Sequence, residues 1–347
     1  MSPHLHILSP GLHTTIQDFG RFGFQDLGVP VAGALDFAGL RLANALVGNQ
    51  PGEACLEIST LGPTLRVEAD SVRLAICGPM RLMLGAAAGG ERRALEADRS
   101  HRLSRGDIVE IGAVAAASVA YLAVAGGFDL APVMGSLSTY VRAGLGPLGG
   151  KPLAVGTVLP LRAATASDSD DLALPEAMAY GGGPIRVMLG PQQDSFTDEA
   201  VATFLSAEYT VSKQADRMGL RLEGPRLAHR AGPDIASDGL VSGCIQVPGD
   251  GGPIILLADH QTTGGYAKIA TVISADLPRL GRAMPGTRLS FAPVSVEQAE
   301  AARQMLEREI ERRITGLRPV GAMIGIDLTA LYDSNLVSGM VDAIDGE

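Results

Sequence analysis

Residues 243–281 read GCIQVPGDGGPIILLADHQTTGGYAKIATVISADLPRLG, and this stretch indicates the fold most clearly. Two apolar runs, at 253–258 and 269–273, have the length and the branched residues that are typical of buried strands. Between them, residues 259–266 are rich in polar side chains and glycine. The pattern predicts a polar loop held by rigid strands, and binding residues concentrate on such loops.

The side chains of this loop supply several kinds of chemistry. A position next to buried strands can shift the pKa of an acid or an imidazole toward neutrality, so we expect Asp259 or His260 to transfer a proton. Gln261, beside them, is also expected to be catalytic. The alternative is a hairpin turn whose polar groups satisfy one another and the backbone. Substrate contacts are expected from the rest of the segment, namely Thr262, Thr263, Gly264, Gly265, Tyr266 and Lys268.

Two arginines in the segment SKQADRMGLRLEGP are candidates for binding an anion. Arg217 and Arg221 are four residues apart, so in a strand both would lie on one face, where guanidinium groups can clamp a carboxylate or a phosphate. Surface ion pairing is the alternative. A further polar turn near the N-terminus, Gln17, Asp18 and Arg21, is expected either to complete a binding site or to hold its own turn through local bonds.

Several blocks resemble the biotin-dependent carboxyltransferase or allophanate hydrolase subunit 2 family, over about residues 5–293. In the second half these blocks are IQVP at 245–248, PIILLADHQTTGGY at 253–266 and IATVISADLPRLG at 269–281. In the first half they are TIQDFGRFG at 15–23, GALD at 33–36, LANALVGN at 42–49 and AVAGGFD at 123–129. Lys151, where the family usually has Arg, and residues 282–286, where it commonly has a Gln, depart from the pattern.

The fold class follows from composition and is refined by the resemblance. A chain of 347 residues is long for one core, and 44 Gly and 21 Pro punctuate short apolar runs, which favours two mainly β units. The resemblance implies two tandem cyclophilin-like β-barrel domains with a few short helices. We expect a first domain at 1–163, a linker at 164–184, a second domain at 185–293, a C-terminal helix at 294–314 and a tail at 315–347 outside the resemblance.

Composition also argues against several classes of function. A net charge of -10 with no basic cluster, and 4% aromatic residues with no Trp, disfavour a nucleic-acid partner. The sequence shows neither a signal peptide nor a spanning apolar segment, so we expect a cytoplasmic protein without a membrane partner. The histidines lack metal-ligand spacing, so no metal site is expected, and the three cysteines are expected to be reduced core thiols.

The resemblance implies an activity and partners. Members of the family include the C subunit of bacterial 5-oxoprolinase, an ATP-dependent enzyme that cleaves 5-oxo-L-proline to L-glutamate. Such a chain would work with 5-oxoprolinase subunits A and B, most directly with the latter, and would be inactive alone. The sequence has no G-x-x-x-x-G-K-[ST] loop and no biotin-carrier signature, so ATP is expected to be bound by the assembled complex and no covalent biotin is expected here.

Two other functions remain open at this stage. The first is a carboxyltransferase-type subunit of a urea carboxylase or allophanate hydrolase system, which would use a separate biotin carrier. The second is a regulatory binder without catalysis, resembling the antagonist of a sporulation-kinase inhibitor.

Overall fold

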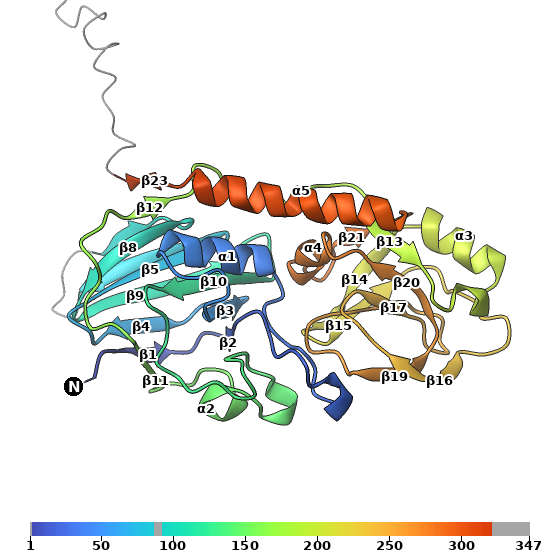
Figure 1. The fold of residues 1–347 in the computed structure, drawn as a ribbon, viewed down its shortest axis with the longest axis horizontal. Helices are drawn as coiled ribbons and strands as arrows, with labels where there is room; N and C mark the ends of the chain where they lie inside the picture. The colour runs from blue at the N-terminus through green and yellow to red at the C-terminus, as the bar shows by residue number, and fades with distance from the viewer. Residues whose placement is uncertain (1, 87–91, 321–347) are drawn as a thin grey trace, which may run out of the picture.

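Strands dominate the computed structural model, which describes residues 2–86 and 92–320 (Figure 1). The predicted mainly β fold, with two tandem cyclophilin-like barrel units, few helices and a long helix near the C-terminus, is confirmed. Of the tail expected at 315–347, residues 321–347 lie outside the described part of the chain.

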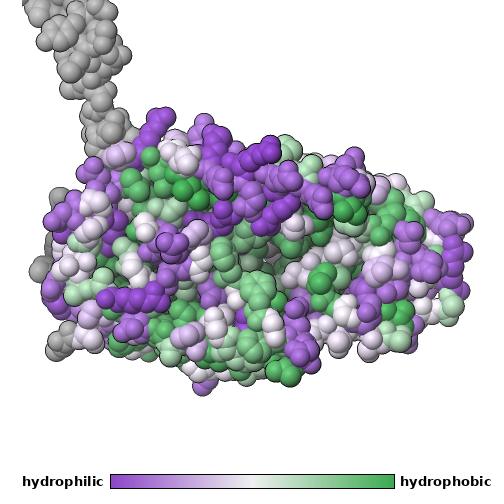
Figure 2. Space-filling model, viewed as in Figure 1, coloured by the Kyte–Doolittle hydropathy of each residue, from purple (hydrophilic) through white to green (hydrophobic). Residues whose placement is uncertain are grey.

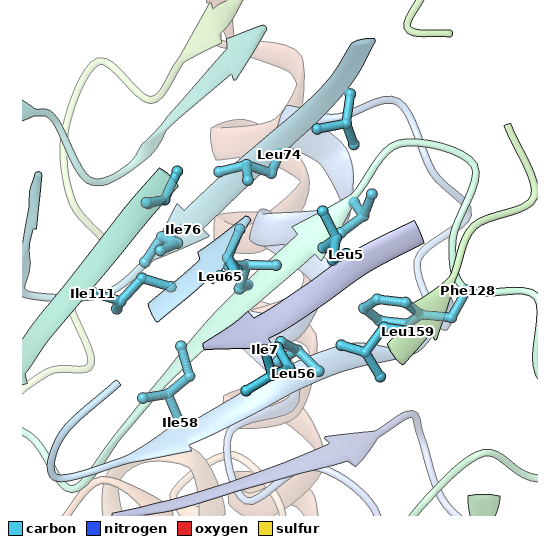
Figure 3. Packing of buried hydrophobic residues seen from close by; sticks show 14 of the residues in the cluster. Leu5, Ile7, Leu56, Ile58, Leu65, Leu74, Ile76, Ile111, Phe128 and Leu159 are labelled. Atoms are coloured by element: carbon cyan, nitrogen blue, oxygen red, sulfur yellow. The ribbon is translucent and has the colours of Figure 1, made fainter. Parts of the chain in front are cut away.

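The first unit consists of two antiparallel sheets around one apolar core. The six-stranded sheet has the spatial order β11 (Val158–Pro160), β1 (His4–Ser9), β4 (Thr64–Val67), β9 (Asp107–Val114), β6 (Met80–Ala86) and β7 (Arg93–Leu95). The seven-stranded sheet has the order β2 (His13–Gln17), β3 (Cys55–Ser59), β10 (Val119–Val124), β5 (Ser71–Cys77), β8 (Arg99–Ser104), β12 (Leu172–Ala173) and β23 (Arg318–Pro319). Alternate residues of β1 and β4 are buried, as a sheet with one face on a core requires. Figure 3 shows Leu5, Ile7 and Leu65 among the side chains that fill this core.

A short helix covers the outer face of the seven-stranded sheet. Every residue of β10 is buried, because one of its faces packs on the core and α1 (Phe37–Leu46) covers the other. Asp36 begins α1, and its carboxylate accepts hydrogen bonds from the backbone N–H groups of Ala38 (3.0 Å) and Gly39 (2.9 Å). Short helical turns elsewhere in this unit are η1 (Gln25–Leu27), η2 (Val141–Ala143) and α2 (Pro147–Gly150).

The second unit is one strongly curved sheet around its own core. The order is β21 (Arg288–Leu289), β14 (Tyr209–Asp216), β15 (Gly219–Glu223), β18 (Ile254–Leu256), β17 (Cys244–Gln246), β20 (Lys268–Val272), β13 (Ile185–Leu189) and β22 (Phe291–Pro293). A separate ribbon pairs β16 (Asp234–Gly239) with β19 (Thr263–Tyr266). The helices of this unit are η3 (Gln193–Ser195), α3 (Asp198–Ser206) and α4 (Leu277–Gly281). The core includes Phe204, Tyr209 and Phe291, whose rings pack together.

The last helix, α5 (Val296–Thr315), lies across both units (Figure 1). Its N-terminus has a capping box, in which the side chains of Ser295 and Gln298 each accept a hydrogen bond from the other residue's backbone N–H. Ala302 packs beside the second unit, whereas Ile314 packs on the cluster around α1. Figure 2 shows hydrophilic side chains along its outward face. None of the described helices has the length and apolar composition needed to cross a membrane.

The segment expected to be a linker runs along the first unit. Within it, β12 pairs with β8 and also with β23, and Asp171 forms a 2.8 Å ion pair with Arg73 of β5. All three cysteines are buried free thiols, as predicted. Burial raises the pKa of the Cys55 and Cys77 thiols, so neither is suited to act as a nucleophile.

Candidate functional site

The polar segment 259–266 begins just after β18, but its second half is not a loop. Thr263–Tyr266 forms β19, which pairs with β16 through Tyr266 opposite Asp234 and Thr263 opposite Gly239. The backbone carbonyl of Thr262 accepts a hydrogen bond from the backbone N–H of Leu240 (2.9 Å). The segment is therefore fixed by main-chain bonds, and its side chains extend from a rigid ribbon.

A groove of about 470 Å³ lies beside this ribbon, on the sheet of the second unit. Three predicted site residues, Arg221, Gln261 and Tyr266, line it together. They come from β15, from the start of the ribbon and from the end of β19, so the fold gathers positions that are far apart in sequence. The groove is also lined by Gln246, Lys213, Gln214, Asp216 and Arg142.

Gln246 is the residue that sequence reasoning missed. It ends β17, is 3% exposed, and its Nε2 donor has no hydrogen-bond partner among the described residues. Gly264 lies directly against this amide, because a Cβ atom at that position would be 2.6 Å from Nε2. The signal was present in the sequence, since a glutamine inside the apolar run CIQV is unexpected. A buried donor without a partner costs free energy unless a ligand accepts from it.

The charges around the groove favour an anion. Arg142 is paired with Asp216 at 3.1 Å, whereas among the described residues no ion pair within 4 Å involves Arg221 or Lys213. Both cations lie on neighbouring strands and are exposed. A concave surface with two positive charges outside any close ion pair raises the local concentration of a small anion.

Arg217, in contrast, is committed to the protein interior. Its guanidinium donates to both carboxylate oxygens of Asp259 (2.9 and 2.8 Å), to Glu57 of the first unit, and to the carbonyl of Gly33 (2.7 Å). Burial lowers the pKa of Arg217, but the Glu57 and Asp259 carboxylates more than offset it and raise that pKa. The predicted arginine pair is therefore divided, with Arg221 on the groove and Arg217 in a buried ion-pair network.

This network lies at the wall of a second cavity, between the two units. The cavity has a volume of about 440 Å³ and adjoins the groove, because Asp216 and Arg142 line both. Asp259 and Arg217 line its second-unit side, and His13 lines its first-unit side. Burial and the nearby Arg217 charge lower the pKa of His13.

His260, which was expected to be catalytic, and Lys268, which was expected to contact the substrate, are also turned inward. His260 is 2% exposed, and its Nδ1 is 2.5 Å from the carbonyl oxygen of Gln261. Lys268 is 2% exposed, and its Nζ donates to Asp238 at 2.8 Å. The structure thus places Gln261 on the groove but does not bring His260 or Lys268 to its lining.

The N-terminal turn forms an internal anchor of the first unit. The Asp18 carboxylate accepts from the backbone N–H groups of Gly20 (2.8 Å) and Leu137 (2.7 Å) and from two serine hydroxyls. Gln17 donates to the carbonyl of Thr139 (3.0 Å). Arg21 is 1% exposed and donates to the carbonyls of residues 133 and 138. These residues therefore hold the turn mainly through bonds to residues 133–139 rather than through a salt bridge within it, and Gln17 Oε1 and Arg21 Nη1 are buried without a partner among the described residues.

Comparison with known proteins places this architecture in a family. Residues 27–293 match the family model described as "Carboxyltransferase domain, subdomain A and B". The chain is similar to the C subunit of 5-oxoprolinase from Escherichia coli, with 36% identity over 311 residues that cover 89% of this chain and 97% of that protein. It is 31% identical to urea amidolyase of Lachancea kluyveri, covering 88% of this chain but 18% of that protein.

A solved structure of a related enzyme has the same fold. The urea carboxylase of Kluyveromyces lactis superposes with a TM-score of 0.81 at 27% identity, covering 90% of this chain and 29% of that one. The match of the family model extends over most of the two units described above, from η1 to the end of β22. This chain therefore belongs to the family of carboxyltransferase domains with subdomains A and B.

Proposed function

We propose that this chain is the C subunit of an ATP-dependent 5-oxoprolinase, which cleaves 5-oxo-L-proline to L-glutamate together with subunits A and B. The similarity to the C subunit of the Escherichia coli 5-oxoprolinase supports this choice, because it covers nearly the full length of both chains. A relative from Haemophilus influenzae with the same name is 31% identical and is covered over 95% of its length. The urea amidolyase relative, in contrast, is a much longer protein.

The groove carries the chemical argument. 5-Oxo-L-proline is a small anion with one carboxylate and one ring amide. Arg221 and Lys213 supply positive charge for the carboxylate, and the buried Nε2 of Gln246 supplies a donor for the ring carbonyl. The single structural observation that carries the proposal is this unpartnered amide beside two cations that have no ion-pair partner among the described residues. Gln261 and Tyr266 complete the polar lining.

The proposed chemistry uses these residues for binding and alignment. An unreactive ring amide becomes hydrolysable once ATP phosphorylates its carbonyl oxygen. Transfer of a phosphoryl group depends on charge and alignment more than on a protein nucleophile. A donor from Gln246 to the ring carbonyl would fix the position of the oxygen that is phosphorylated. We propose that ATP is bound by the assembled complex, that the B subunit is the most direct partner, that the protein is cytoplasmic, and that this chain alone has no turnover.

Reconstitution tests the proposal. The chain is mixed with candidate subunits A and B, and release of L-glutamate from 5-oxo-L-proline is measured with and without ATP. We expect release of L-glutamate only when all three chains and ATP are present. Gln246→Leu should reduce kcat/KM for 5-oxo-L-proline by about tenfold or more, because a donor to the reacting group is lost. Full activity without this chain would refute the assignment.

A second function is favoured by two observations. The TM-score of 0.81 against a urea carboxylase and the 31% identity to a urea amidolyase are compatible with a carboxyltransferase-type subunit. In that case turnover of urea would require a separate biotin carrier. A reaction that depends on added biotinylated carrier, and not on subunits A and B, would select this alternative.

A further inference from the structure

The buried ion-pair network connects the first unit to the polar segment of the second. Arg217 lies in the turn between β14 and β15, Glu57 lies on β3, and Asp259 begins the segment that carries Gln261. The residues that form the network are at most 9% exposed. The guanidinium fork thus joins carboxylates from two different units.

On the first-unit side, Glu57 is held rigidly. One of its oxygens accepts from the Tyr121 hydroxyl (2.6 Å) and from the backbone N–H of Leu35 (2.9 Å), and the other accepts from Arg217. The Tyr121 hydroxyl in turn accepts from the backbone N–H of Asp36 (2.8 Å). The Glu57 carboxylate is therefore held by groups on β10 and just before α1. It gives Arg217 a fixed hydrogen-bond partner in the first unit.

On the second-unit side, the same arginine fixes the start of the polar segment. The backbone N–H of Asp259 donates to the carbonyl of Arg217 (2.8 Å), in addition to the two side-chain bonds. Gln261, which lines the groove, is two residues further along. Since the chain between them is short, a displacement of Asp259 moves Gln261 as well.

We infer that Glu57 is a positioning residue, which acts from the first unit through Arg217 and Asp259 to set the place of Gln261 on the groove. This inference rests on the proposed function for the role of the groove. Removing the Glu57 charge weakens the bond from Arg217 Nη1, so the bond from Nη2 to the Gly33 carbonyl (2.7 Å) becomes the main contact of Arg217 with the first unit, and the Arg217–Asp259 pair is held less firmly. The units still meet elsewhere, because the Ser118 hydroxyl donates to the carbonyl of Gly281 (2.7 Å).

Amide hydrogen exchange on the full chain tests the structural part. Glu57→Gln keeps the volume of the side chain and removes its charge. Exchange at residues 259–266 is expected to be about tenfold faster than in the wild type, while β20 keeps its protection. The matched control is Glu53→Gln, which breaks a 2.9 Å ion pair with Arg162 inside the first unit. Unchanged exchange at 259–266 in Glu57→Gln would overturn the inference.

Kinetics of the assembled complex test the functional part. Glu57→Gln is expected to raise KM for 5-oxo-L-proline about tenfold and to leave KM for ATP unchanged, because a displaced groove residue affects one substrate. An equal effect on both KM values would overturn the positioning role. If the wild-type complex has no 5-oxoprolinase activity and the segment still loosens in Glu57→Gln, the proposed function fails and the positioning stands.

A milder variant keeps the test usable if Glu57→Gln does not fold. Tyr121→Phe removes the hydroxyl that holds Glu57 and leaves the carboxylate in place. A smaller acceleration of exchange at residues 259–266 is expected. If a folded Tyr121→Phe protein shows no change there, the inference is refuted.

Discussion

Two polar turns of this protein, 17–21 in the first unit and 259–266 in the second, use similar residue types for different purposes. In the first, the Asp18 carboxylate and two nitrogens of Arg21 bond to backbone and hydroxyl groups of residues 133–139, although Arg21 Nη1 and Gln17 Oε1 are buried without a partner among the described residues. In the second, Gln261 lines a groove beside the unpartnered amide of Gln246. The difference is that a neighbouring segment of the chain fills the space around the first turn, whereas the space beside the second stays open.

The comparison also separates two kinds of charged residue within the second unit. Asp259 and Arg217 form hydrogen bonds with each other in the protein interior, so they stabilise the segment that borders the groove. Arg221 has no ion-pair partner among the described residues and faces the groove. A polar residue is therefore available for a ligand where it lies on an open groove and also has hydrogen bonds left unmade, and residue type alone reveals neither condition.

The largest effect is expected when the anchor of the second turn is removed. Arg217→Met leaves the Glu57 and Asp259 carboxylates buried without their shared cation, and removing one partner of a buried ion pair costs about 3–5 kcal/mol of unfolding free energy. Denaturant unfolding measures this loss. Arg142→Met is the control, since its exposed pair with Asp216 contributes at most about 1 kcal/mol. Equal losses in the two variants would show that the network is not buried as described.

The next effect concerns the first turn. Asp18→Asn replaces an oxygen that accepts from several donors, and it should lower the free energy of unfolding by about 1–3 kcal/mol. KM of the assembled complex for 5-oxo-L-proline should not change, because this turn binds the first unit to itself. Thermal unfolding and steady-state kinetics together check the prediction. A stable variant with a raised KM would place the first turn in the site.

A matched pair of glutamines sharpens the comparison further. Gln246→Leu should leave the free energy of unfolding within about 1 kcal/mol of wild type, since it removes an unsatisfied buried donor. Gln17→Leu should lose about 1 kcal/mol, because its amide donates to the backbone carbonyl of Thr139. Only the first should weaken binding of 5-oxo-L-proline, as measured by titration of the assembled complex. The reverse pattern would exchange the roles assigned to the two turns.

The smallest effect is a pH dependence within the second turn. Burial lowers the pKa of His260 below the ordinary value of 6.5, although the Gln261 carbonyl and Asp259 act in the opposite direction. On acidification the unfolded chain therefore binds this proton first, so stability is present above pH 6.5 and falls as the pH drops below it. His260→Gln should flatten this fall in unfolding curves taken at several pH values. His13 and His101 shift in the same direction, so part of the slope should remain. An unchanged slope would contradict the buried position of His260.

Much of the fold followed from patterns that depend on local chemistry. The helix expected at 294–314 and the apolar runs on either side of residues 259–266 correspond to α5, β18 and β20, because the spacing of apolar residues depends on nearby positions in the sequence. The pairing of β12 with β8 was not predictable in this way, since it depends on packing across the whole first unit.

The site was predicted only in part, for a similar reason. The sequence indicated the right segment, and Arg221, Gln261 and Tyr266 do line one groove. Whether a residue such as His260 faces outward depends on its neighbours in space, and here the residue is buried. Gln246 was not predicted as a site residue because it lies in a short strand. Only the fold shows that its Nε2 donor has no partner among the described residues.

The most direct test is a crystal structure of the complex with candidate subunits A and B, grown with 5-oxo-L-proline. We predict ligand density in the groove, with the ring carbonyl within hydrogen-bond distance of Gln246 Nε2 and the carboxylate toward Arg221. Density in the cavity between the two units, beside His13 and Asp259, with an empty groove would contradict the account.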